Sequence, residues 1–150
     1  NCMSHLLLKD TFDNFSFIEG EITTFNKFTI SGFLQEDFFD EKPEETYSRW
    51  NKTRDFCFRI IRGKRTPLGF KIVLALPEDQ IPYFLTAHGL TGYRPEEIRG
   101  LYLNFHYDGH HLQCITGTSL NTFTMDKSIE REWDQEVKNI LKSRSIEGDY

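Results

Sequence analysis

The chain has 150 residues, of which 38% are hydrophobic and 27% are charged, and its formal net charge at pH 7 is −5. A chain of this length can bury enough apolar surface to fold as a single globular domain over residues 1–150 without a disulfide or a metal. The negative charge argues against a general nucleic-acid or membrane-surface binder, and no apolar run approaches the roughly 20 residues of a membrane span, so we expect no membrane partner.

The cysteines indicate a reducing environment. Cys2, Cys57 and Cys114 lie far apart and form no C-x-x-C pair, and the last two fall among apolar residues. A free thiol in such surroundings usually acts as a small hydrophobic side chain, and unpaired cysteines are typical of reducing compartments. We therefore expect a reducing compartment.

The first third of the chain predicts a short helix and a hairpin. Residues 3–12 have the spacing of an amphipathic helix. Two runs rich in Phe, Ile and Thr follow, FSFIEGEITTF and FTISGFLQ, and Asn26-Lys27 between them favours a turn. Residues 36–45 contain six acidic groups and a proline, which indicates a solvated connection with Phe38 and Phe39 either packed against the domain or exposed.

The middle of the chain predicts helix, strand and helix. Apolar residues recur at helical spacing over residues 46–62, and Gly63 and Pro67 then supply a stop. Residues 67–76, PLGFKIVLAL, are apolar and short enough for a buried central strand, which we favour, although a buried helix could share this composition. Residues 77–88 resemble a short helix that contains Pro82.

A second hairpin is predicted around Asp108-Gly109, a pair that readily forms a two-residue type I′ turn. That turn would pair Tyr107 with His110 and place His106 opposite His111. The alternation puts Leu101, Leu103, Phe105 and Tyr107 on the core face and His106 on a polar face.

The end of the chain predicts one more helix after a Thr-rich stretch, TGTSLNTFTM, which is either a short strand or an ordered loop. The helix has apolar residues at i, i+4, i+8, i+11 and i+12, and Trp133 among them should dock it on the sheet. Together these elements predict an α+β fold, a mainly antiparallel sheet of about five strands with helices packed largely on one face.

His106 and His111 form a candidate metal site. Directly opposite residues in a non-hydrogen-bonded pair have Cα atoms about 4.5 Å apart, close enough for two imidazoles to share one metal ion or a proton. A third ligand is missing, although nothing in the sequence excludes His5 or His88. The alternative is that both histidines are ordinary polar residues of an exposed sheet face.

A basic cluster forms a candidate anion-binding site. Arg59, Arg62, Lys64 and Arg65 concentrate positive charge in an acidic chain, Thr66 follows, and Arg54 and Lys71 add to the charge. Arginine binds phosphate through two parallel hydrogen bonds, and a threonine hydroxyl adds another donor. The alternative is that these side chains complement the dipole of the preceding helix or pair with the acidic residues 36–45.

Three stretches carry a family resemblance: residues 3–15, 56–76 and 101–134, which begin MSHLLLKDTFDNF, FCFRIIRGKRT and LYLNFHYDGHH. They resemble a family of uncharacterised single-domain proteins from anaerobic Gram-positive bacteria. The resemblance implies one domain and a bacterial, cytoplasmic setting. It implies no activity, cofactor or catalytic residue.

No phosphate-binding, dinucleotide-binding, zinc-protease or nucleophile-elbow motif occurs, so the sequence specifies neither a reaction nor a cofactor. The leading hypothesis is a small binding domain for an anionic ligand or a protein partner, with residues 59–65 as the contact. A rival hypothesis is a metal-assisted hydrolase or nucleic-acid-processing enzyme that uses His106 and His111. A third hypothesis is a homo-oligomer that covers a sheet edge or the Phe38-Phe39 pair.

Overall fold

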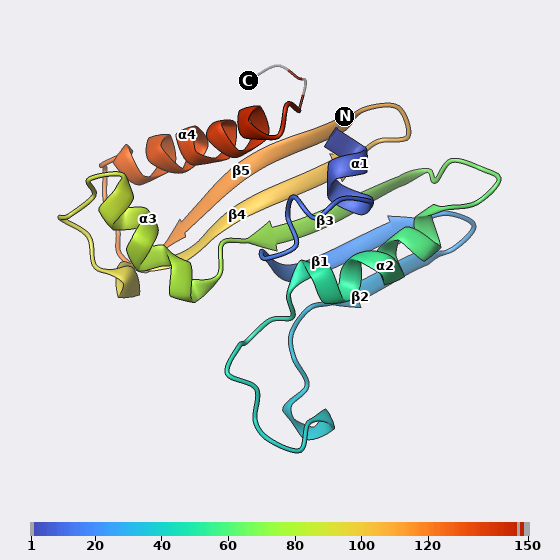
Figure 1. Ribbon diagram of the computed structural model, residues 1–150, viewed down its shortest axis with the longest axis horizontal. Coiled ribbons are helices and arrows are strands. Elements are labelled where there is room, and N and C mark those ends of the chain that lie inside the picture. The colour runs from blue at the N-terminus through green and yellow to red at the C-terminus, as the bar shows by residue number, and fades with distance from the viewer. Residues whose placement is uncertain (1, 147, 149–150) are drawn as a thin grey trace.

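A computed structural model describes residues 2–146 and 148, which contain a five-stranded antiparallel sheet and four α-helices. The strands lie in the order β2-β1-β3-β4-β5, so the predicted α+β class is confirmed (Figure 1). The strands are β1 (Ser16–Thr23), β2 (Lys27–Ser31), β3 (Gly69–Ala75), β4 (Ile98–Tyr107) and β5 (Leu112–Leu120). The helices are α1 (Cys2–Leu7), α2 (Trp50–Ile61), α3 (Ile81–Ala87) and α4 (Ser128–Ser143). Short 3₁₀ turns cover Glu36–Phe38, Glu78–Gln80 and Pro95–Glu97.

The helices cover one face of the sheet. Along β3 and β4, Ile72, Leu74 and Leu103 are completely buried, whereas Lys71 and His106 between such positions are exposed. Figure 1 shows α1, α2 and α4 lying over the same side of the strands, with α3 at one end. The other face is therefore open to solvent, as the alternation of apolar and polar residues predicts.

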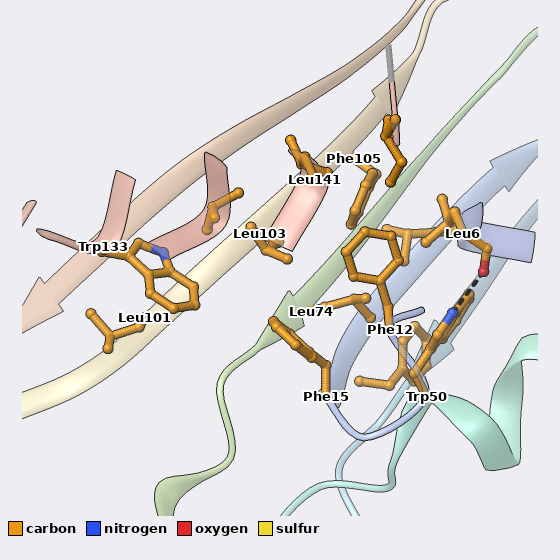
Figure 2. Close-up of a cluster of buried hydrophobic side chains, with 14 of the residues drawn as sticks. Leu6, Phe12, Phe15, Trp50, Leu74, Leu101, Leu103, Phe105, Trp133 and Leu141 are labelled. Atoms are coloured by element: carbon orange, nitrogen blue, oxygen red, sulfur yellow. Dashed lines mark hydrogen bonds between the residues drawn. The ribbon is translucent and has the colours of Figure 1, made fainter. Parts of the chain in front are cut away.

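Two tryptophans hold the helices on this face. Trp50, the first residue of α2, is fully buried, and its indole N–H donates to the Leu6 carbonyl of α1 at 2.9 Å (Figure 2). Trp133 of α4 is also fully buried and donates to the Tyr102 carbonyl of β4 at 3.0 Å. The predicted docking of the last helix through Trp133 is confirmed.

Most predicted elements are present, with shorter helices. The β1–β2 hairpin and the central strand β3 are confirmed. The helix predicted over residues 3–12 ends at Leu7, because the chain turns to bury Phe12 against Phe105, with ring centroids 5.2 Å apart. The helix predicted from residue 46 begins at Trp50, because Tyr47 lies in an extended segment that forms a bridge with Phe33.

The acidic connection exposes its aromatic pair. Phe38 is 85% and Phe39 41% exposed, and their rings contact each other edge to face at 5.6 Å. Figure 1 shows this segment extending away from the sheet below β2. Of the two alternatives from the sequence, the exposed one is therefore correct, while oligomerisation through these rings stays a prediction.

Substitution of Gly32 tests how closely the chain after β2 approaches the backbone of β1 at Phe17. A Cβ atom at this position would lie 1.8 Å from the carbonyl oxygen of Phe17, a backbone atom that cannot move aside alone. We expect Gly32→Ala to lower the free energy of unfolding by about 3 kcal/mol, the upper end of the usual cost of overpacking.

Urea denaturation measures this loss, and Gly92→Ala is the matched control because nothing lies within 4 Å of its Cβ position. The control should change the free energy of unfolding by less than about 1 kcal/mol. Equal losses in the two variants would contradict the close approach of Gly32 to Phe17.

Candidate anion-binding site

Four cationic side chains lie at the end of α2 and in the loop after it. Arg59 is in the last turn of the helix, and Arg62, Lys64 and Arg65 belong to residues 62–68. All four are exposed, and none has an ion-pair partner among residues 2–146 and 148. Thr66 is exposed beside them. These charges are therefore available to an outside partner.

The acidic segment does not neutralise this cluster. Glu36 pairs with Lys42 at 3.7 Å within its own segment, and Glu45 pairs with Arg49 at 2.8 Å. No ion pair joins residues 36–45 to the basic cluster in the part of the chain that is described. Of the two structural roles considered for these charges, the one that remains is stabilisation of the helix dipole. It applies to Arg59, which lies near the negative end of α2.

Arg54 does not belong to the cluster. Its guanidinium Nε lies 2.9 Å from Asp13 Oδ1, and its Nη2 donates to Asp13 Oδ2 at 3.1 Å. Both side chains are only 18% exposed. Arg54 therefore serves the fold by tying α2 to the segment before β1.

Three connections meet at one end of the sheet: residues 24–26, 62–68 and 108–111 (Figure 1). The Leu68 N–H donates to the Thr23 carbonyl at 2.9 Å, and a Cβ at Gly109 would lie 3.0 Å from the Leu68 oxygen. Lys71, near the start of β3, is exposed at the same end and has no ion-pair partner within the described residues. We call Arg59, Arg62, Lys64, Arg65 and Lys71 together the basic end.

The predicted pairing of His106 with His111 is wrong. The turn contains four residues, Tyr107 pairs with Leu112, and His106 pairs with Gln113. The cause is the Asp108 carboxylate, which accepts the backbone N–H groups of His110 at 2.8 Å and His111 at 2.7 Å. These two donors, from His111 and His110, hold the pKa of Asp108 below its ordinary value. His111 consequently lies in the turn rather than across from His106.

The candidate metal site rested on His106 and His111 lying directly opposite each other, and the observed register does not place them so. Among the residues that the structure describes, no group of three or more His, Cys, Asp and Glu side chains is placed to hold a metal ion. His5 is buried, with its Nδ1 2.7 Å from the Thr11 hydroxyl, and His88 lies between two glutamates. The use of His106 and His111 as ligands stays a prediction from sequence.

A depression of about 260 Å³ lies on the sheet beside the basic end. Its lining includes Glu21, Lys71 and His106, which the register aligns across β1, β3 and β4. Lys71 and His106 can donate hydrogen bonds to an anion, while Glu21 is held by Lys27 at 3.5 Å. The site therefore has exposed cations on a loop beside donors on two strands.

Sequence reasoning missed Glu21 and Thr23 as neighbours of this depression. Alternation along β1 predicts that Glu21 points away from the core. No local pattern, however, predicts that β1 pairs with β3 across the long connection between them.

A family model matches residues 5–149. The chain belongs to DUF5721, a family of unknown function. The resemblance seen in the sequence is thereby confirmed as one to an uncharacterised family. No curated protein and no solved structure matches the chain. Within the described residues, no helix has the length and apolar character needed to cross a membrane.

His88 forms a titratable cluster with two glutamates, Glu132 and Glu136. Its Nδ1 lies 3.0 Å from Glu132 and its Nε2 2.7 Å from Glu136, and its side chain is 12% exposed. Only the protonated ring can donate to both carboxylates at once. Burial lowers the pKa of His88, but hydrogen bonds and charge from Glu136 and Glu132 outweigh burial and raise it overall. The cluster joins α3 to α4.

This cluster should make stability depend on pH. Because the pKa of His88 is raised on folding, its contribution is complete below the unfolded value of about 6.5 and is lost as the pH rises through the folded value. We expect His88→Ala to lower the free energy of unfolding by about 2 kcal/mol at pH 5.5 and by clearly less at pH 9.

Urea denaturation at both pH values checks this difference. His110→Ala is the control, because His110 is exposed in the β4–β5 turn. Losses for His88→Ala that are equal at the two pH values would contradict an ionised link.

Proposed function

We propose that this protein binds a phosphate-bearing ligand through the basic end. The observation that supports this is the set of four exposed cations, Arg59, Arg62, Lys64 and Arg65, which lack ion-pair partners among the described residues of an acidic chain. Four like charges within seven residues repel one another, so the cluster itself contributes little to the stability of the fold. An anion bound among them removes that repulsion.

The composition of the cluster favours phosphate over other anions. Three of the four cations on the loop and helix end are arginines, whose planar guanidinium groups match pairs of phosphate oxygens. Thr66 supplies a hydroxyl in the same loop. Lys71 and His106 offer further donors in the depression beside them. This combination suits a ligand with more than one phosphate group.

We also propose that the protein works in the cytoplasm of a bacterium. The three cysteines are free, and Cys57 is completely buried, where burial raises the pKa of its thiol to about 12. A thiol so protected from ionisation is an inert part of the core. Free thiols of this kind support a reducing compartment.

Charge reversal at the basic end tests the binding function. We expect Arg62→Glu combined with Lys64→Glu to weaken binding of a fluorescein-labelled oligothymidylate at least about tenfold, because two attractive contacts become repulsive. Fluorescence anisotropy at two salt concentrations measures both affinity and its salt dependence, which should become shallower in the variant.

The matched control combines Lys52→Glu with Arg131→Glu, exposed positions on α2 and α4 that produce the same change in net charge. An equal loss of affinity in this control would show that total charge, not the basic end, governs binding. A polyglutamate peptide of similar length serves as a second probe. If it binds as tightly as the oligothymidylate, recognition of phosphate is refuted.

A further inference from the structure

A groove of about 600 Å³ lies between β5 and α4, and it shares no lining residue with the depression beside the basic end. Residues 112–116 of β5 line one side, and Asp134, Val137, Lys138 and Leu141 of α4 line the other. The rest of the lining is Cys2, Ile146 and Gly148. Its volume falls within the range of about 300–1,000 Å³ that is typical of ligand sites.

The groove takes in the edge of β5 as well as its helix-covered face. Leu112, Cys114 and Thr116 pair with core-facing residues of β4, so their side chains lie on the side of the sheet that α4 covers. Consecutive side chains of a strand point to opposite faces, yet all five residues from 112 to 116 line this groove. β5 is the outermost strand, and its only neighbour in the sheet is β4. Alternate backbone N–H and C=O groups on its outer side therefore have no strand partner among the described residues.

The β5 strand itself lacks the charged residues, prolines and short length that commonly prevent strand addition. β5 is nine residues long, LQCITGTSL, and contains no charged residue and no proline. The opposite edge, β2, has five residues and begins with Lys27. Charges, prolines and short length are the common means of blunting an exposed edge. Of the two edges, β5 is the one open to another strand.

We propose that this groove binds an extended peptide segment of a partner protein, which adds to the sheet as a strand beside β5. Five residues span about 17 Å at 3.4 Å per residue, which matches the length of strand that lines the groove. Backbone hydrogen bonds to β5 would hold the peptide, and pockets for alternate side chains would select its sequence.

The walls indicate the chemistry of that peptide. Val137 and Leu141 are buried residues of α4 at the base of the groove, so they favour apolar side chains at alternate positions of the peptide. Asp134 already accepts a hydrogen bond from the Thr116 hydroxyl. Lys138 has no ion-pair partner among the described residues, so an acidic side chain of the peptide complements it.

A separate peptide fits this groove better than a second copy of the chain. A second copy that offered its own β5 would bring its α4 alongside, because α4 packs against β5. The α4 helices of both copies would then have to share the space beside the paired edges, where the groove has room for one strand. A peptide carries no such helix.

Selection from a phage-displayed library of random nonapeptides on the full chain tests this proposal. We expect the enriched peptides to alternate apolar residues and to carry an acidic residue. When one of them is synthesised, it should slow amide hydrogen exchange in residues 112–116. Lys138→Glu should weaken its binding at least about tenfold, a loss of about 1.4 kcal/mol, and Lys52→Glu on α2 should leave it unchanged.

The remaining outcomes overturn the proposal. Failure to enrich any peptide means that the edge does not accept a strand. Protection of amides in residues 62–68 instead of 112–116 moves peptide binding to the basic end. A dimer by light scattering in which the amides of residues 112–116 are already protected assigns the groove to a second copy.

Discussion

Trp50 and Trp133 each bury an entire indole ring and donate its N–H to a backbone carbonyl of a different element. Through these two bonds α2 is fixed to α1 and α4 to β4, so the helices gather on one face of the sheet. Figure 2 shows the bond from Trp50 to Leu6 and the buried ring of Trp133. Because a buried indole needs a partner for its N–H, each ring fixes an orientation as well as a contact. The uncovered face, the turns at the ends and the edge of β5 are what this packing leaves for other molecules.

Positive and negative charges lie on different parts of this fold. The chain is acidic overall, but the connection between α2 and β3 carries cations to the end of the sheet where two hairpin turns also lie. The acidic residues 36–45 extend from a different part of the molecule and form their own ion pairs. A local surface of positive sign can therefore act in a protein of negative net charge, because screening confines each field to roughly 8–10 Å.

Local patterns predicted local structure well. The β1–β2 hairpin, the central strand β3 and α4 all follow from residue type and period, and the predicted strand faces were correct even where boundaries shifted. Predictions from local pattern were wrong where a tertiary or side-chain interaction outweighed the local preference. The Asp108 carboxylate captured two backbone N–H groups and lengthened a turn, and Tyr47 paired in an extended bridge with Phe33 where a helix was expected. The basic residues could be named from sequence, but their meeting with Lys71 and His106 required the pairing of strands far apart in the chain.

An NMR titration with oligothymidylate tests most directly whether the basic end recognises phosphate. Amide chemical shifts of a ¹⁵N-labelled sample should change saturably in residues 62–68 and in the adjoining turns at 24–26 and 108–111. Shifts confined to residues 112–116 and α4, or no shifts at ligand concentrations far above that of the protein, would contradict the account.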